Sequence, residues 1–150
     1  MKVNSVVVSA LLIVFSSCAV AAERYVDPIQ KNIDEKHSLL VQKYKKTCKA
    51  KNRISCEFEA KDHAEEDIPS RGSLSYSKKT YAGYSSAQAK SKLKELVSLY
   101  DRIDGQSKSS WDGKMTPTRI ESEIRWLMVN KLGFGTGDVI QAKMYLGLPV

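Results

Sequence analysis

The chain has 150 residues, of which 42% are hydrophobic and 27% are charged. This is the composition of an ordinary globular protein, so it argues against intrinsic disorder, and the length predicts a single domain. The formal net charge is +7, from 24 basic and 17 acidic side chains. A basic balance of this size favours an anionic partner or surface, or simply serves solubility.

The first 22 residues show the features of a cleavable secretory signal peptide. Lys2 gives a positive start, Val6–Phe15 is an uncharged run, and small side chains follow as far as Ala22. Signal cleavage needs small side chains at positions −1 and −3, which the alanine-rich end of this stretch provides. The run is much shorter than the roughly 20 apolar residues of a membrane span, and no later run is longer. We therefore predict that residues 1–22 are removed on export and that residues 23–150 form one periplasmic domain without a transmembrane segment.

Cys18 allows a second interpretation of this leader. The stretch Phe15-Ser16-Ser17-Cys18 resembles the lipobox of bacterial lipoproteins, in which a small residue precedes a cysteine that becomes acylated. Leu is usual at the position of Phe15, which argues against lipidation. We favour loss of Cys18 with the signal peptide and keep an outer-membrane lipoprotein as the alternative.

Cys48 and Cys56 remain in the mature domain as a pair. An even number of cysteines in an oxidising compartment normally forms disulfides, so we predict a Cys48–Cys56 bridge. A metal site is the rival interpretation, but two thiolates without a further cysteine or a suitably spaced histidine make a poor zinc site. The bridge would connect the last turn of a helix to the segment that follows it.

A first helix is predicted from Pro28 to about residue 50. Asp27 can cap its N-terminus, Pro28 suits the first turn, and Gln30 can reach back to complete a capping box. Side chains suited to the interior then recur at steps of three or four residues, as they do on one face of a helix. These are Ile29, Ile33, His37, Leu40, Tyr44 and Cys48.

The middle of the chain is predicted to be irregular. Residues 54–58 alternate between apolar and polar, which indicates a short extended segment. The acidic stretch Glu57–Asp67 follows, and we expect it to lie near the basic first helix. Residues 68–84 are rich in Ser, Gly, Lys and Tyr, which is typical of a long loop. Within this loop, Ser73–Tyr76 and Lys79–Tyr81 are the candidate strands of a small hairpin.

Three further helices are predicted after this section. The first covers residues 85–104 and begins with a Ser-x-x-Gln capping box. The second covers residues 117–132, and its broad apolar stripe indicates a central position. A short third one, over residues 137–146, has Thr136 as its expected cap. The predicted fold class is therefore mainly α: three longer helices and a short C-terminal one, packed antiparallel, with an irregular, disulfide-stapled middle.

We find no motif in the sequence that predicts catalysis or a cofactor. The glycine-rich stretch Gly133–Gly137 follows a helix instead of a strand and lacks a phosphate-binding lysine, so we interpret it as a helix end and a turn. Asp62–Glu66 offers carboxylates and one imidazole, but the only other histidine is His37 and a third metal ligand is missing. No serine lies in a G-x-S-x-G motif, and the Ser-x-x-Lys match Ser75-Tyr76-Ser77-Lys78 is expected by chance in a stretch so rich in Ser and Lys. We therefore predict that the protein is not an enzyme and uses no cofactor or metal.

The best candidate for a binding surface combines tyrosines with basic side chains after residue 70. Tyrosine and arginine are enriched where proteins bind proteins, because large rigid rings bury area at a low entropic cost. The alternative is an ordinary loop packed on its own domain. The predicted contact residues are Arg71, Tyr76, Lys78, Lys79, Tyr81 and Tyr84.

An exported helical domain without catalytic motifs is typical of two functional classes. One is an accessory or scaffolding protein of an envelope assembly, such as pilus biogenesis or a secretion system, that acts by protein–protein interaction. The other is a periplasmic immunity protein or inhibitor of a toxin or cell-wall hydrolase. Loss of Lys2 leaves a net charge of +6, whereas inhibitors of basic wall-cleaving enzymes should be acidic, so we favour the first class. The expected partners are another envelope protein and an anionic envelope surface, not nucleic acid; the sequence indicates no oligomeric state.

Overall fold

The computed structural model describes residues 25–49, 52–106 and 116–150. The signal peptide predicted over residues 1–22, and Cys18 within it, lie outside the described residues. The described chain is mainly helical, as predicted, and none of its helices is both long and apolar enough to cross a membrane. The helices are α1 (Pro28–Thr47), α2 (Arg53–Asp67), α3 (Leu74–Tyr81), α4 (Ser86–Asp104), α5 (Pro117–Lys131) and α6 (Val139–Leu146).

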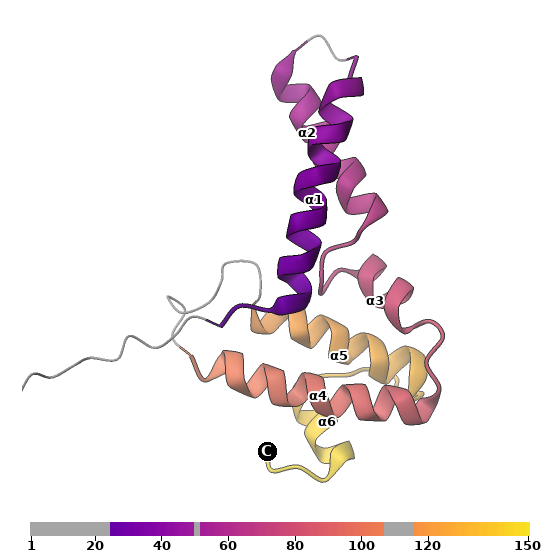
Figure 1. Ribbon diagram of the computed structural model, residues 1–150. Coiled ribbons are helices and arrows are strands. Elements are labelled where there is room, and N and C mark those ends of the chain that lie inside the picture. Colours follow the sequence, from indigo (N-terminus) through magenta and orange to yellow (C-terminus); the bar gives the residue numbers. More distant parts are fainter. Residues whose placement is uncertain (1–24, 50–51, 107–115) are drawn as a thin grey trace, which may run out of the picture.

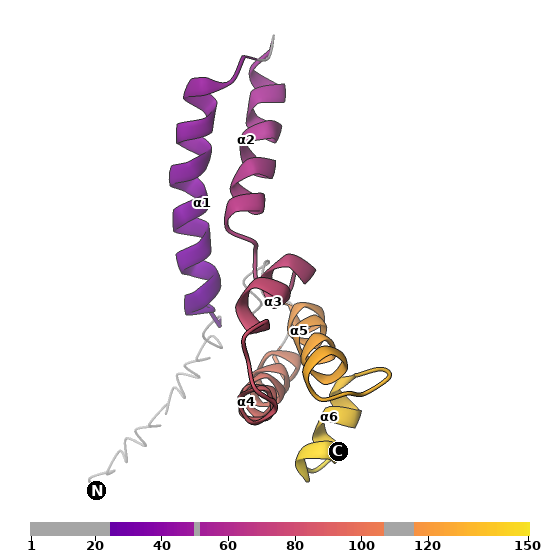
Figure 2. The ribbon, with the colours of Figure 1, turned by 90° about the vertical axis from the view of Figure 1, so that its right-hand side faces the viewer.

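Figures 1 and 2 show two parts of different shape. Helices α1 and α2 form a long antiparallel hairpin, which projects from a body made of α3 to α6. In the body, α4 and α5 pack side by side and α6 packs against both of them. Helix α3 contacts α5 and lies between the hairpin and the rest of the body. The closed end of the hairpin therefore points away from the body.

The hydrophobic core of the body lies between α4 and α5. The apolar stripes predicted for both helices are buried: Leu93 and Leu96 of α4, and Ile120 and Ile124 of α5, are at most 1% exposed. Phe134, in the turn after α5, packs against the same core. Full burial of one such side chain contributes about 1.5–3 kcal/mol, so these residues dominate the stability of the body. The prediction that the α5 segment is central is confirmed.

Helix α1 begins as predicted, with one difference. The Asp27 carboxylate caps it and accepts a hydrogen bond from the N–H of Gln30 at 2.9 Å. The Gln30 side chain, however, does not complete a capping box. Its oxygen accepts a hydrogen bond from the N–H of Arg71 (2.9 Å), and its nitrogen donates to Asp34 (3.0 Å). A long-range bond to another segment therefore replaces the local one.

Residues 53–67 form a helix, so the prediction of an extended and then irregular segment was wrong. The side-chain oxygen of Asn52 caps α2 and accepts a hydrogen bond from the N–H of Ser55 at 2.7 Å. The buried face of α2 consists of the alanines Ala60 and Ala64, each 1% exposed. Small side chains let α2 pack closely on α1, and they leave only a weak apolar stripe in the sequence.

The candidate hairpin over residues 73–81 was also wrong, because these residues form α3. The Ser73 hydroxyl caps the helix and accepts a hydrogen bond from the N–H of Tyr76 at 3.1 Å. Ser77 and Tyr81, four residues apart, are the buried positions. A spacing of four belongs to a helix face and not to the face of a strand.

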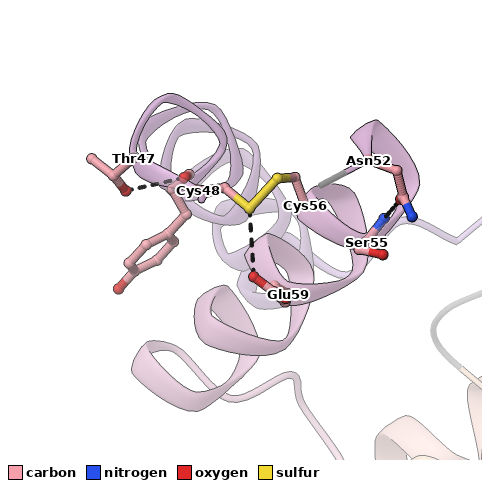
Figure 3. Close-up of a disulfide and its surroundings, with 7 residues drawn as sticks. Thr47, Cys48, Asn52, Ser55, Cys56 and Glu59 are labelled. Atoms are coloured by element: carbon pink, nitrogen blue, oxygen red, sulfur yellow. Dashed lines mark hydrogen bonds between the residues drawn. A yellow bond between two sulfur atoms is a disulfide. The ribbon is translucent and has the colours of Figure 1, made fainter. Parts of the chain in front are cut away.

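The predicted disulfide between Cys48 and Cys56 closes the end of the hairpin (Figure 3). It joins the residue after α1 to the first turn of α2, with the two Cα atoms 5.7 Å apart. On the neighbouring turn, Lys45 of α1 lies 3.5 Å from the carboxylate of Glu57. The acidic stretch therefore lies along the basic first helix, as expected.

The glycine-rich stretch forms the turn between α5 and α6. A Cβ on Gly137 would lie 2.8 Å from the Cβ of Met128, so only glycine lets this turn pack on α5. The cap of α6 is Asp138, which accepts a hydrogen bond from the N–H of Gln141, and not Thr136 as predicted. Gly147 ends the helix in a left-handed conformation with φ +68°.

Candidate partner-binding groove

The residues predicted to contact a partner do not form one exposed surface. Tyr81 is fully buried and Arg71 is 3% exposed. The ring of Tyr81 packs edge-on against the rings of Tyr76 and Tyr84, at centroid distances of 6.1 and 5.2 Å. These tyrosine rings thus pack mainly on one another inside the domain. We therefore remove Arg71 and Tyr81 from the predicted contact surface.

The other predicted contact residues reach the surface of α3 or the turn after it. Lys78 and Lys79 are exposed, and Tyr76 and Tyr84 are partly buried. Tyr76 and Lys79 line the same groove, which has a volume of about 490 Å³ and lies between α1, the end of α2 and α3. Lys78 and Tyr84 do not line it. Two of the six predicted residues are therefore brought together at one candidate site.

The groove has an apolar floor and a basic rim. Ile33 of α1 and Pro69 after α2 are buried in its floor, and Ile29 is 39% exposed beside them. Lys36 of α1 and Lys79 of α3 line the groove from its two sides, and both are exposed. Apolar side chains that remain accessible next to unburied cations can take an occupant that is apolar and carries negative charge.

Two hydrogen bonds beside the groove tie the end of α2 to α1 and to α3. The Lys79 ammonium donates to the carbonyl oxygen of Asp67 at 2.9 Å, and His37 Nε2 is hydrogen-bonded to the carbonyl of Ile68. Both carbonyls belong to the end of α2, where backbone oxygens lack partners within the helix. The chain segment that leaves α2 is thus held between α1 and α3.

A buried charged cluster next to the groove joins the hairpin to the body. Arg71 Nη1 donates to Asp27 Oδ1 at 2.8 Å, and Arg71 Nε donates to Glu123 Oε1 at 2.9 Å. Both carboxylate side chains are at most 2% exposed. The Tyr81 hydroxyl donates to the second oxygen of Glu123, and the Arg71 N–H binds Gln30. The cluster connects the start of α1, the loop before α3, α3 itself and α5.

Burial shifts the proton affinity of this cluster. It raises the pKa of Glu123 above 4.5, although Arg71 and Tyr81 oppose the shift. Burial also raises the pKa of Tyr81, and the nearby Glu123 charge adds to this. Burial by itself would lower the pKa of Arg71, but the carboxylates of Glu123 and Asp27 raise it further than burial lowers it. The guanidinium therefore stays charged, and the cluster is a buried structural joint between the hairpin and the body.

Sequence reasoning missed a second groove, between α3 and α5. It has a volume of about 380 Å³ and is lined by Leu74, Trp126 and Val129, among others. Leu74 is 72% exposed and Val129 is 38% exposed. The sequence signal for this groove was the unusual width of the apolar stripe on α5, which includes Trp126 and Val129. The neighbouring helices do not cover the whole width of this stripe, so part of it lines the groove.

The acidic and histidine-bearing stretch is spread over an exposed face of α2. His63 Nδ1 lies 3.4 Å from Glu66, and its ring lies 5.2 Å from the ring of Tyr44. Across residues 25–49, 52–106 and 116–150, no three His, Cys, Asp or Glu side chains are placed to hold a metal ion.

Comparison of the chain with protein-family models, with curated proteins and with solved structures found no match in any of the three. A function for this chain therefore rests on its own residues and on their arrangement.

Proposed function

We propose that the chain is an exported accessory or scaffolding protein of an envelope assembly, such as a pilus or secretion apparatus, and that it acts by binding another envelope protein. The observation that carries this proposal is the groove between α1 and α3, in which accessible apolar side chains lie beside Lys36 and Lys79. The helices around it supply a rigid frame, because the Arg71 cluster fixes the position of α1 on the body.

The chemistry of the groove defines the partner. Ile29 and Tyr76 offer apolar and aromatic surface, and a tyrosine buries area at little entropic cost. The two lysines at the rim favour carboxylates on either side of the bound segment, and they disfavour a basic segment. A cavity of about 490 Å³ holds a few side chains and not a whole helix. The partner segment should therefore be short, with apolar anchors flanked by Asp or Glu.

The covalent structure supports an extracytoplasmic compartment. The Cys48–Cys56 disulfide persists in oxidising compartments and is rare in the cytosol. It is consistent with removal of residues 1–22 as a signal peptide. The intact mass of the protein purified from the periplasm should correspond to a chain that starts near residue 23 and lacks two hydrogen atoms, as one disulfide requires. A full-length chain with free thiols in the cytosol would contradict the proposal.

Site-specific photo-crosslinking in living cells tests the groove. A photoreactive amino acid at Asn32, an exposed residue of the groove, should give a discrete adduct with one envelope protein. The matched control is the same amino acid at Gln42, which is exposed on α1 outside the groove. Mass spectrometry of the adduct should locate the crosslink in a segment that combines apolar residues with carboxylates.

The outcomes separate this function from its alternatives. Adducts at Gln42 that equal those at Asn32, or no adduct at Asn32, would contradict the groove as the binding site. An adduct with a toxin or a cell-wall hydrolase would replace the accessory role with that of an immunity protein or inhibitor. An adduct with a component of a pilus or secretion apparatus, lost when the groove is altered, would support the proposal.

A further inference from the structure

The closed end of the α1–α2 hairpin is a separate surface. We define the hairpin tip as residues 45–49 and 52–58, which include the last turn of α1 and the first turns of α2. Figures 1 and 2 show that the tip points away from the body. The Cys48–Cys56 disulfide holds the two helix ends together there (Figure 3). With about 1.5 Å of rise per residue, a helix of this length carries the tip roughly 30 Å from the start of α1.

Positive charge at the tip is only partly neutralised within the described chain. The carboxylate of Glu57 is shared by Lys45 (3.5 Å) and Lys61 (3.0 Å). The remaining basic side chains of the tip are exposed and form no ion pair with a described carboxylate. They are Lys46, Lys49 and Arg53.

Large apolar side chains project from the same end. Ile54 is 70% exposed and Phe58 is 63% exposed. They are four residues apart on α2, so they lie on the same face of the helix, one turn from each other. Large apolar side chains exposed to water beside unpaired cations indicate a binding surface, because a membrane or a protein partner would bury the apolar area.

We propose that the hairpin tip binds an anionic lipid surface. Lipid headgroups with negative charge attract Lys46, Lys49 and Arg53, while the boundary of the acyl chains accepts Ile54 and Phe58. The phosphates of a nucleic acid would pair with the basic side chains but would leave Ile54 and Phe58 exposed to water. The contact is peripheral: the tip touches the interface while the hairpin extends back to the body. This surface is distinct from the groove and does not depend on the function proposed for it.

Vesicle sedimentation tests the charge requirement. The purified protein, with its disulfide intact, should sediment with vesicles that contain phosphatidylglycerol and not with vesicles of phosphatidylcholine alone. Each basic side chain near an anionic surface contributes about a fivefold change in partitioning, so the triple variant Lys46→Gln, Lys49→Gln, Arg53→Gln should bind on the order of 100-fold more weakly. A triple variant of exposed lysines outside the tip, Lys31→Gln, Lys78→Gln, Lys94→Gln, has the same net charge and should retain most of the binding.

Apolar insertion is tested separately. The variant Ile54→Ser, Phe58→Ser should lower partitioning by about tenfold or more, because the interface no longer buries the two side chains. Leu39→Ser is the control, since Leu39 is 68% exposed on the same hairpin but outside the tip. In addition, the tryptophan introduced by Phe58→Trp should be quenched by brominated lipid, whereas one introduced by Leu39→Trp should not.

The proposal is overturned by any of three results. One is the absence of binding to phosphatidylglycerol vesicles, and another is equal binding by the tip variants and their controls. The third is binding that depends on the basic side chains alone, with no quenching of the Phe58→Trp variant and full competition by DNA, which would assign the tip to a polyanion. Circular dichroism checks that each variant is folded. Quenching of Phe58→Trp reports insertion of the tip into the lipid while the protein is bound, so it does not require a variant that has lost binding.

Discussion

Arg71 and Glu123 are 52 residues apart in the chain and meet in the interior, where Arg71 Nε donates to Glu123 Oε1 over 2.9 Å. The same guanidinium binds Asp27 at the start of α1. These bonds hold the hairpin on the body, and they set the position of the groove relative to the hairpin tip. A buried pair of this kind is weak evidence for high stability, but removal of one member leaves the others charged and unpaired.

The Arg71 joint should be essential for folding. Arg71→Leu leaves the buried carboxylates of Asp27 and Glu123 without a cation, which should cost about 3–5 kcal/mol of unfolding free energy. Urea denaturation followed by circular dichroism measures this. Arg53→Leu is the matched control, because Arg53 is exposed and its loss should change stability by at most about 0.5 kcal/mol. Equal effects of the two substitutions would show that the joint is not needed.

Glu123 should make stability depend on pH. Because burial raises its pKa in the folded protein, the folded state binds more protons than the unfolded state above pH 4.5. The unfolding free energy should therefore fall as the pH rises from about 4.5 through the folded pKa. Glu123→Gln removes this titration, so its stability should decline less over the same range in urea titrations. Glu95→Gln, an exposed site, should follow the wild type; parallel curves for all three proteins would contradict the assignment.

Gly72, next to Arg71, should tolerate no side chain. Its φ is +81°, and a Cβ there would lie 2.5 Å from the Cβ of Arg119. The left-handed backbone and the clash together should destabilise Gly72→Ala by about 2 kcal/mol or more. Gly83→Ala is the control, because a Cβ at Gly83 would meet no other part of the chain within 4 Å and the φ of Gly83 is not positive. Thermal unfolding of the two variants side by side checks this, and similar melting temperatures would contradict it.

The disulfide should stabilise the hairpin tip more than the body. In the chain-entropy model, a bridge that closes a loop of this length contributes about 2–3 kcal/mol. Cys48→Ser, Cys56→Ser should therefore lose about that much stability, with faster hydrogen exchange over residues 45–49 and 52–58 and little change in α4 and α5. Uniform acceleration of exchange over all helices would instead mean that the hairpin and the body unfold as one unit.

The longer helices could be predicted from sequence because their signals are local. The capping box of Ser85 and Gln88 is formed as expected, with the Gln88 N–H and the Ser85 hydroxyl 3.2 Å apart. The apolar stripes of α4 and α5 were strong because each helix packs a wide face into the core. In these helices the apolar stripe and the residues at the helix ends predicted the same structure.

Helix α2 could not be predicted in the same way. Ile54 and Phe58 suggested the alternation of a strand, but both point into solvent. The true buried face is made of Ala60 and Ala64, which add little to a hydrophobic pattern. Helix α3 is short and polar, so its helical state depends on tertiary contacts of Tyr81 and not on its own propensity.

The candidate site was only partly predictable for a related reason. Tyr76 and Lys79, two of the predicted contact residues, both line the groove. The burial of Arg71 and Tyr81 depends on Glu123, a residue far away in the sequence. A pattern of tyrosines and cations does not reveal which members face inward, because that is decided by long-range partners.

The proposed function requires that the groove between α1 and α3 binds an acidic, apolar segment of another envelope protein. Isothermal titration calorimetry measures the affinity of the purified protein for the free partner, once crosslinking has identified that partner. Lys36→Glu, Lys79→Glu should abolish measurable binding, while Lys31→Glu, Lys78→Glu, with the same net charge on exposed sites outside the groove, should bind like the wild type. Equal affinities of both double variants would show that the partner does not bind in this groove.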